Sequence, residues 1–440
     1  MKRRFWVIAA IAAVGLVAGQ TYTQGAKEAA APNGNEELYK ELELFEHALS
    51  IVRSDYVEEP KAKELIYGAL KGMLATLDPY SQFMDPDSYN ELKVDTEGEF
   101  GGLGIEITIK DDLLTVISPI DGTPAANAGL MPGDRIVKID GELTRGITLI
   151  EAVKKLRGKP KTSVTLTIFR EGDTELKEVV LERAVITIES VREASLLEDS
   201  IGYIRLSDFR EKTTDDLEAA VKRLKGQGMD SVIFDLRNNP GGLLDVAVSV
   251  SELFLQRNQL IVSTKGRLRN QNQEMHSRTT GLASDLPMVV LINEGSASAS
   301  EIVAGAIQDH HRGVVMGTKS HGKASVQTIF PLKDGSALRL TTSKYFTPSG
   351  RSIHGQGIVP DVEVPFERPP EEKPKEKDKE GSSSGPQLFD QIEAGQDPNA
   401  KPPASLIERK RADNQLARAL DLLKGIKVYQ AEPKQEHASR

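Results

Sequence analysis

Three alternate serines, Ser296, Ser298 and Ser300, stand where an apolar segment gives way to a helical pattern. The apolar run predicts a buried strand over Met288–Asn293, and the spacing that follows predicts a helix over Ala299–Asp309. A serine at such a turn can be exposed while the N-terminus of the helix stabilises a developing negative charge. Serine is also a preferred helix cap, so the stretch alone favours capping and leaves a nucleophile open.

A nucleophilic serine needs a base. No pattern singles out a histidine, and His310 and His311 lie at a predicted helix end, where a cation is comfortable. Lys323, which follows Gly322, is the candidate, because burial can lower the pKa of a lysine toward neutrality. The residues thus allow serine–lysine chemistry.

The segment Gly317–Lys323 also approaches the phosphate-binding pattern G-x-x-x-x-G-K-[ST]. Ala324 replaces the hydroxyl residue that would hold magnesium, and residues 326–330 have the pattern of a strand where that motif needs a helix. Nucleotide binding is therefore the weakest of the enzymatic alternatives.

A second glycine site, Gly241-Gly242, ends a predicted strand and opens a predicted helix. Paired glycines let backbone N–H groups approach a ligand closely, although a simple tight turn needs the same residues. The pair can supply part of an oxyanion hole.

Strands and helices alternate over residues 186–365, which predicts an α/β layer architecture. The expected strands are Ile201–Leu206, Val232–Leu236, Met288–Asn293 and Val314–Gly317, and the expected helices are Thr214–Gly226, Gly242–Leu255 and Ala299–Asp309. A β-hairpin is expected over residues 326–346, around Asp334-Gly335.

Residues 98–184 have a different pattern, of short β segments separated by Gly-Asp and Asp-Gly turns. Strands are expected at Thr115–Ile117, Arg135–Ile139 and Val164–Phe169, with one helix at Leu149–Leu156. This segment is expected to be a separate β-rich domain.

Both ends of the chain carry amphipathic helices. Two are expected over residues 36–78 and one over Ala404–Leu423, ended by Gly425. The Pro-, Glu- and Lys-rich stretch 366–403 cannot bury enough apolar area to fold and is predicted to be a disordered linker. The helices need a partner surface, which is either the rest of this chain or a second subunit, and they suggest self-association.

The chain has 440 residues, a net charge of −9 and no cysteine. The charge argues against nucleic-acid binding, and the absence of cysteine excludes disulfides and thiolate chemistry. Residues 1–26 combine a basic start (Lys2, Arg3 and Arg4) with an apolar run, which indicates a signal peptide or an uncleaved membrane anchor. Either one predicts export, to the periplasm or the outer face of the cytoplasmic membrane.

Together these features resemble the C-terminal processing peptidases, or tail-specific proteases, over residues 36–365 and the last helix. Lys323 lies 25 residues after Ser298, and Gln327 four residues further, as in that family's catalytic set. The resemblance implies that Ser298 attacks, that neutral Lys323 takes its proton, and that Gln327 positions the lysine. Four residues span about 13 Å in a straight strand, so a bend or a long lysine reach is needed.

The same resemblance implies an oxyanion hole made by the N–H of Ala299 and that of Gly241 or Gly242. Residues 98–184 resemble a PDZ domain, whose loop would bind a terminal carboxylate while the peptide adds a strand. That loop comprises Gly102, Leu103, Gly104 and Ile105. Arg157 or Arg170 would contact the lysine–glutamine pair, although either could be an ordinary surface charge.

The resemblance implies an α/β multidomain protein, with a crotonase- or ClpP-like serine peptidase core, an inserted PDZ domain and flanking helices. The expected boundaries are 1–26 (signal or anchor), 36–97 (helical region), 98–184 (PDZ), 185–365 (peptidase), 366–403 (linker) and 404–425 (helix). The expected activity is endopeptidase cleavage of exported proteins recognised by their tails, with no cofactor or metal, a possible adaptor and a homo-oligomeric state. The alternative is a PDZ-based binding protein with a latent protease domain.

Overall fold

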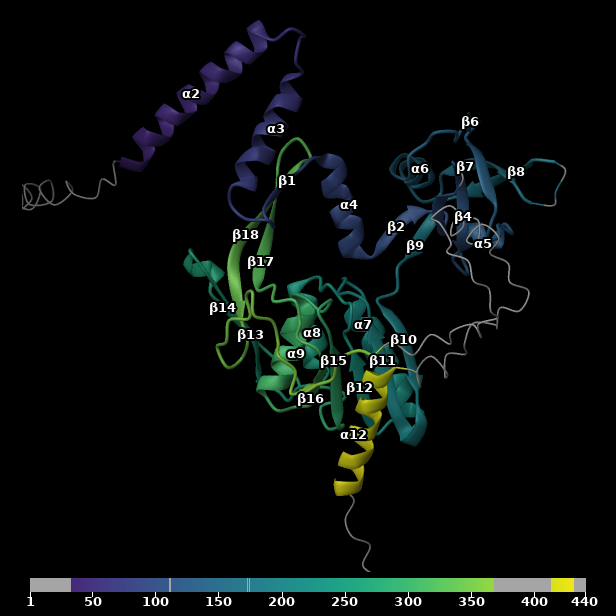
Figure 1. Cartoon of the computed structure of the whole chain (residues 1–440), viewed down its shortest axis with the longest axis vertical. Helices are drawn as coiled ribbons and strands as arrows, with labels where there is room; N and C mark the ends of the chain where they lie inside the picture. The colour runs from purple at the N-terminus through teal and green to yellow at the C-terminus, as the bar shows by residue number, and fades with distance from the viewer. Residues whose placement is uncertain (1–32, 111, 172, 174, 368–412, 431–440) are drawn as a thin grey trace, which may run out of the picture. The chain divides into compact units, whose positions relative to one another are not determined.

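The computed structural model describes residues 33–110, 112–171, 173, 175–367 and 413–430 (Figure 1). The expected signal or anchor, nearly all of the expected linker and the start of the expected last helix lie outside these residues. The chain divides into two units, residues 1–77 and 78–440. None of the described helices is both long and apolar enough to span a membrane.

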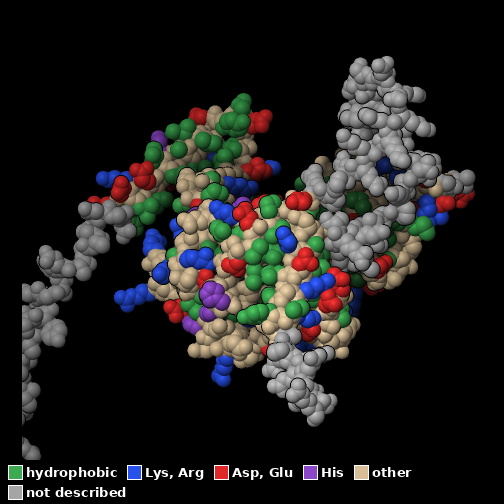
Figure 2. Space-filling model, turned by 60° about the horizontal axis from the view of Figure 1, so that its bottom comes forward, with side chains coloured by type: hydrophobic (Ala, Val, Ile, Leu, Met, Phe, Trp, Pro, Cys, Tyr) green, Lys and Arg blue, Asp and Glu red, His purple; other side chains and the backbone are tan. Residues whose placement is uncertain are grey.

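The first unit contains two helices, α2 (Asn33–Asp55) and α3 (Ala62–Ala75), as the sequence predicts. Large apolar side chains on α2 are exposed, including Leu38, Leu42 and Phe45 at 55%, 51% and 45%. Figure 2 shows hydrophobic side chains on the visible face of these helices. Nothing within the described part of this unit covers them.

The centre of the second unit is a six-stranded sheet in the order β10-β11-β12-β15-β16-β19. Its strands are β10 (Val191–Leu196), β11 (Ile201–Leu206), β12 (Ser231–Asp235), β15 (Met288–Ile292), β16 (Val314–Gly317) and β19 (Val362–Glu363). All neighbours are parallel except β10 and β11. The predicted α/β architecture is confirmed.

Helices cover both faces of this sheet. The large core on one face includes residues of α7 (Thr213–Gly226), α8 (Leu244–Glu252) and α9 (Ala299–Asp309). On the other face, Leu416, Ala419 and Leu423 of α12 (Asn414–Gln430) pack against the strands (Figure 1). The apolar face of this last helix is therefore buried in its own chain. Gly425 does not end the helix as predicted, because a single glycine lowers helix propensity without breaking the hydrogen-bond pattern, and α12 continues to Gln430.

A second sheet holds the predicted hairpin, β17 (Ser325–Pro331) and β18 (Ala337–Phe346). Three strands not expected from the sequence complete it: β1 (Gln82–Met84), β13 (Leu260–Gly266) and β14 (Gln273–His276). A helix that was also not expected, α4 (Pro86–Glu97), follows β1. Its N-cap Asp85 accepts a hydrogen bond from the Ser88 N–H, and proline occupies its first turn.

The β-rich domain has its own sheet and core. Its strands are β3 (Ile105–Lys110), β4 (Leu113–Pro119), β5 (Arg135–Ile139), β6 (Glu142–Leu143), β7 (Ser163–Phe169) and β8 (Lys177–Glu182), and its helices are α5 (Pro124–Asn127) and α6 (Leu149–Leu156). The chain enters through β2 (Glu99–Gly102) and leaves through β9 (Ala184–Thr187), which pair with each other. This pairing is what an inserted domain requires. β3 lies at an edge of the sheet and can accept a further strand.

Candidate active site

The nucleophile elbow, residues 293–299, connects β15 to α9. Ser298 has φ 53° and ψ −112°, a strained conformation that costs about 1–3 kcal/mol for a residue with a side chain. The hydroxyls of Ser296 and Ser300 are buried and donate to the carbonyls of Leu236 and Asn239, at 2.7 and 2.9 Å. Of the three serines, only Ser298 lines the adjacent cavity of about 560 Å³. The elbow thus presents one serine and uses the other two for structure.

The glycine turn, residues 236–242, connects β12 to α8 beside the elbow. Gly241 has φ +98°, and a Cβ there would lie 2.8 Å from the Ser298 Cβ, so only glycine fits. The Gly241 N–H donates to the side chain of Asn239 at 2.9 Å. Among the described residues, the N–H groups of Gly242 and Ala299 have no acceptor. Of the two glycines, it is therefore Gly242 whose N–H is available to an oxyanion.

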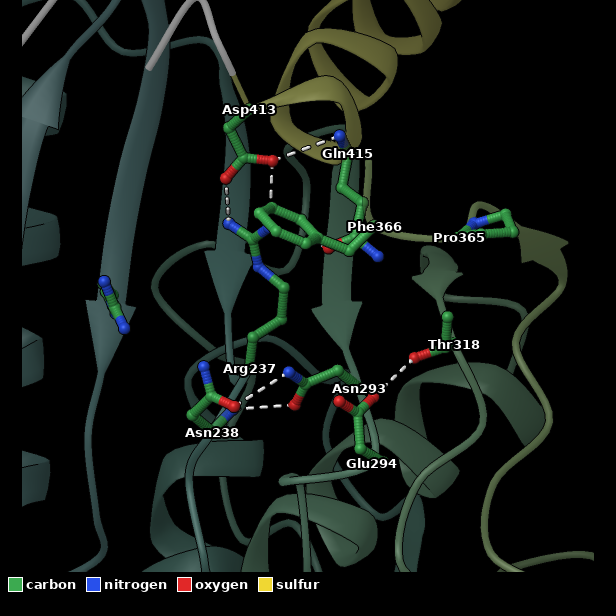
Figure 3. A pocket seen from close by; sticks show the side chains of 10 residues that line it. Arg237, Asn238, Asn293, Glu294, Thr318, Pro365, Phe366, Asp413 and Gln415 are labelled. Atoms are coloured by element: carbon green, nitrogen blue, oxygen red, sulfur yellow. Dashed lines mark hydrogen bonds and ion pairs between the residues drawn. The ribbon is translucent and has the colours of Figure 1, made fainter. Parts of the chain in front are cut away.

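The elbow and the glycine turn are bound directly to each other. Asn238 donates its backbone N–H to Asn293 Oδ1 at 2.8 Å, and Asn293 Nδ2 donates to Asn238 Oδ1 at 2.9 Å. Figure 3 shows this pair of bonds at the ends of the two parallel strands. The Asn239 carbonyl also accepts the Ala297 N–H at 3.0 Å. The spacing between the serine and the candidate oxyanion donors is fixed by these bonds.

An arginine at the start of the glycine turn ties it to the last helix. Arg237 contacts Asp235 at 2.6 Å. It also contacts Asp413, just ahead of α12, at 2.8 Å (Figure 3). It also donates to Gln415 at 2.8 Å. Burial alone would lower the pKa of Arg237, but hydrogen bonds and charges from the two aspartates raise it. We call Asp235, Arg237 and Asp413 the arginine clasp.

Glu301 joins the elbow to the lysine loop, residues 318–324. Its fully buried carboxylate accepts from the Ser298 N–H at 2.8 Å and the Lys323 N–H at 2.9 Å. It also accepts from Ser320 Oγ at 2.5 Å and the Gly322 N–H at 2.7 Å. No role for Glu301 was predicted from the sequence. Its only local signal is its position three residues after a helix-capping serine, where glutamate is common.

The Lys323 amine lines the same cavity as Ser298. It lies 4.8 Å from the centre of the Tyr80 ring, and no described carboxylate is close enough to form an ion pair with it. Burial lowers the pKa of Lys323, the positive charge of Arg339 lowers it further, and Glu301 opposes both. A lysine in this environment is suited to act as a base.

Tyr345 provides a second link between the two loops. Its buried hydroxyl donates to the Lys323 carbonyl and lies 3.1 Å from the Ser298 carbonyl. Burial, followed by the charge of Glu301, raises the pKa of Tyr345 well above its ordinary value. The phenol therefore remains a neutral hydrogen-bond donor.

Gln327 lies on β17 and lines the cavity. Its amide donates to Ser325 Oγ at 2.9 Å and to Thr341 Oγ1 at 3.4 Å, and it makes no hydrogen bond with Lys323. Lys323 precedes β17, and the strand register shifts between Val326 and Gln327. A register shift of this kind bends a strand locally, and both side chains line the same cavity.

The glycine-rich loop of the β-rich domain borders a groove of about 100 Å³ between β3 and α6. The lining includes the four residues selected from the sequence, namely Gly102, Leu103, Gly104 and Ile105, together with Phe100, Ile107, Val153, Leu156 and Arg157. Among described residues, the N–H groups of Leu103 and Gly104 have no acceptor. Free N–H groups beside an open strand edge are what a terminal carboxylate and its peptide need.

The two arginines selected from the sequence differ in their surroundings. Arg170 donates to Asp134 at 2.7 Å and to the Gly129 carbonyl at 2.8 Å, within its own domain. Arg157 lies 4.5 Å from the Phe100 ring centre and lines the groove. Neither contacts Lys323 or Gln327 in this arrangement. The geometry gives Arg170 a structural role and places Arg157 at the peptide groove.

The phosphate-loop alternative does not fit the structure. The segment after Lys323 is the strand β17, where the motif needs a helix. The N–H groups of Gly322 and Lys323, which would have to cradle phosphates, donate to the Glu301 carboxylate. In the described part of the chain, no group of acidic or histidine side chains could hold a metal ion.

Comparison with known proteins identifies the family. Residues 200–364 match the model for peptidase family S41, residues 115–170 that for the PDZ domain, and residues 9–88 that for the activating protease CtpB N-terminal domain. A carboxy-terminal-processing protease of Bartonella bacilliformis is 48% identical over 76% of this chain and 77% of its own length. A carboxyl-terminal-processing protease of Synechocystis is 40% identical over 71% and 74%.

Among solved structures, a photosystem II D1 C-terminal processing protease is similar. It is 31% identical, with a TM-score of 0.42, over 72% of this chain and 86% of its own. The identity to the Bartonella protein, over three quarters of both chains, shows the relationship. The chain is therefore a serine peptidase of family S41 with a PDZ domain, and it belongs to the C-terminal processing proteases.

Proposed function

We propose that this protease is an exported endopeptidase that cleaves by a serine–lysine mechanism and selects proteins by their C-terminal tails. The observation that carries the mechanism is the bridge made by Glu301. This single buried carboxylate holds the backbones of Ser298 and Lys323 together, beside two N–H groups that have no acceptor among the described residues.

In the proposed reaction, neutral Lys323 takes the proton of the Ser298 hydroxyl as its oxygen attacks the scissile carbonyl carbon. The N–H groups of Ala299 and Gly242 stabilise the resulting oxyanion. The lysine ammonium then returns the proton to the leaving amine as the peptide C–N bond breaks. Water, deprotonated by the lysine, hydrolyses the acyl-enzyme and frees Ser298. Gln327 would orient the lysine once the substrate fills the cavity, since catalytic hydrogen bonds often form only in the complex.

Tail recognition is proposed for the groove between β3 and α6. A substrate carboxylate would bind the N–H groups of Leu103 and Gly104, and the tail would pair with β3. Apolar side chains such as Leu103 and Leu156, which are buried, and Ile107 favour an apolar terminal residue.

Export is proposed from the basic and apolar start of the chain, which predicts a periplasmic site or the outer face of the cytoplasmic membrane. The exposed apolar residues of α2 favour a homo-oligomer through the first unit. An adaptor protein remains a further proposed partner.

Cleavage of an unfolded substrate, with and without an apolar C-terminal tail, tests the proposal. Residues 36–440 would be compared with their Ser298→Ala and Lys323→Met variants, and fragments mapped by mass spectrometry. We expect cleavage that needs both residues and favours the tailed substrate. Cleavage by Ser298→Ala would show that Ser298 is not the nucleophile. Tail binding without cleavage by any form would instead support the binding protein with a latent protease domain.

A further inference from the structure

Arg339 is a second cation in the active-site cavity. It lies on β18, opposite Ile329 of β17 and Gln82 of β1, and its partly buried side chain lines the cavity with Lys323 and Gln327. Its Nε donates to the Tyr80 carbonyl at 3.2 Å. Within the described part of the chain, its guanidinium has no carboxylate partner. Lys323 and Arg339 thus line one cavity, and neither forms an ion pair with a described residue.

The segment that binds Arg339 also covers the lysine. Asp78 accepts the N–H groups of Tyr80 and Ser81 at 2.8 and 2.9 Å. Thr341, two residues after Arg339 on β18, donates to Asp78 at 3.2 Å. The Tyr80 ring is thereby held over the Lys323 amine while the Tyr80 carbonyl holds Arg339. We call residues 78–81 the tyrosine strap.

Other charged and titratable groups face this site from each neighbouring element. α9 contributes Glu301, β18 contributes Tyr345 with Arg339, and the tyrosine strap contributes Asp78 and Tyr80. Asp95 of α4 and an ion pair between Asp208 and Arg210, at 3.0 Å, complete the cavity lining. The Glu301 oxygens already accept four hydrogen bonds, so its charge is largely compensated.

We propose that Arg339 is a positioning residue that keeps Lys323 neutral. Its permanent positive charge lines the same cavity as the lysine amine, and neither cation has a carboxylate partner among the described residues. Guanidinium does not lose its proton in proteins, so the lysine is the group that gives up its charge. The tyrosine strap holds the Arg339 guanidinium through the Tyr80 carbonyl. The Tyr80 ring over the amine acts against Arg339, because an aromatic face favours a cation. This inference rests on the proposed role of Lys323 as the base.

The first test is the pH dependence of kcat/KM for wild-type protease and for Arg339→Met and Arg339→Lys. Deprotonation of Lys323 should set the acidic limb of the profile. We expect Arg339→Met to move this limb upward by about one pH unit, with activity recovered at high pH and KM unchanged. Arg339→Lys should restore most of the wild-type profile. Arg351→Met, which removes an exposed cation paired with Asp309, is the matched control and should leave the limb in place.

The second test measures Lys323 without relying on cleavage. In the Ser298→Ala background, trace acetic anhydride would label amines across a pH range, and mass spectrometry would give the apparent pKa of Lys323. We expect Arg339→Met to raise it by the same amount as the limb moves. An unmoved limb with a higher KM would show that Arg339 binds substrate and would overturn the proposal. Lower activity at every pH with unchanged labelling would also overturn it, in favour of a purely structural role.

The two proposals fail separately. If Lys323→Met retained cleavage, the serine–lysine mechanism would be wrong, whatever Arg339 does. If Lys323 proved essential while Arg339→Met left both the limb and the labelling unchanged, only the role of Arg339 would be wrong.

Discussion

The catalytic domain contains two partly buried cations that are treated in opposite ways. Arg237 forms ion pairs with Asp235 and with Asp413, the second of which Figure 3 shows. Burial lowers its pKa, but the two aspartates more than offset this effect and raise the pKa above its ordinary value. In the active-site cavity, Lys323 has no described carboxylate partner, and burial lowers its pKa. A paired cation stabilises the fold, whereas an unpaired one is reactive and weakens it. The arginine clasp thus stabilises the glycine turn, whereas the neighbouring cavity, with its unpaired lysine, lowers the stability of the folded protein.

The largest effect is expected from breaking the arginine clasp with Asp235→Asn. Asp235 is 1% exposed and also accepts the Tyr203 hydroxyl at 2.8 Å. The isosteric change therefore removes the buried partner of Arg237 and leaves only the more exposed Asp413 to compensate its charge. Loss of one partner of a buried ion pair costs about 3–5 kcal/mol. Urea denaturation monitored by circular dichroism would measure it. Asp285→Asn, at a side chain 71% exposed, is the control, and equal stability of the two variants would contradict the comparison.

A smaller effect is expected at the elbow, where the site stores strain. Both Ser298→Gly and Ser298→Ala remove the proposed nucleophile, but only glycine accepts φ 53° and ψ −112° without strain. The glycine variant should be more stable than the alanine variant by about 1 kcal/mol, after the greater chain entropy of unfolded glycine is subtracted. Thermal melts of the two inactive proteins would show it. A more stable alanine variant would mean that the elbow is relaxed.

Lys323→Met should abolish cleavage and slightly stabilise the protein at neutral pH. Since folding lowers the pKa of Lys323 below its ordinary 10.5, the unfolded chain binds the proton more tightly. The destabilisation is therefore complete below the folded-state pKa and disappears as pH rises past 10.5. The side chain is only half-buried and is screened by solvent, so a gain of about 0.5 kcal/mol is expected at pH 7. Urea titrations would give the free energy of unfolding of Lys323→Met and of the wild type. The difference between them should be smaller at pH 10.5 than at pH 7, and an equal difference at both pH values would exclude a protonation effect.

The smallest effect is expected from an exposed ion pair. Lys154 contacts Asp87 at 2.8 Å, but the two side chains are 73% and 79% exposed. Water and salt screen such a pair, so Lys154→Ala should leave the melting temperature unchanged within error. A clearly lower melting temperature would show that the exposure of an ion pair does not predict its contribution to stability in this protein.

The sequence predicted the parts of the site that follow from local pattern. The strand before Ser298, the helix after it and the glycine turn appear where periodicity placed them. The role of Glu301 was not predictable, because it depends on a contact with a loop some twenty residues away. Arg339 appeared only as one residue of the predicted hairpin, and residues 78–81 were assigned no role.

The flanking helices show the same limit of prediction. Leucine spacing predicted amphipathic helices at both ends of the chain, and both are present. The spacing of leucines indicates that one face of a helix is apolar and packs against another surface. It does not indicate which surface that is. For α12 the cover is the sheet of its own domain, so this helix gives no support to the predicted self-association. For α2 the apolar face is exposed, and self-association stays a prediction.

The arginine clasp also has a consequence for the timing of assembly. A chain is synthesised from its N-terminus, and Asp413 with α12 follows every other element of the catalytic domain. Until that segment has been made, Arg237 lacks its outer partner and one face of the sheet lacks its helix. The turn that carries Gly242 is therefore completed last. We therefore expect a chain made in this order to become fully active only after α12 has folded, which would limit the time during which an incomplete chain can cleave its neighbours.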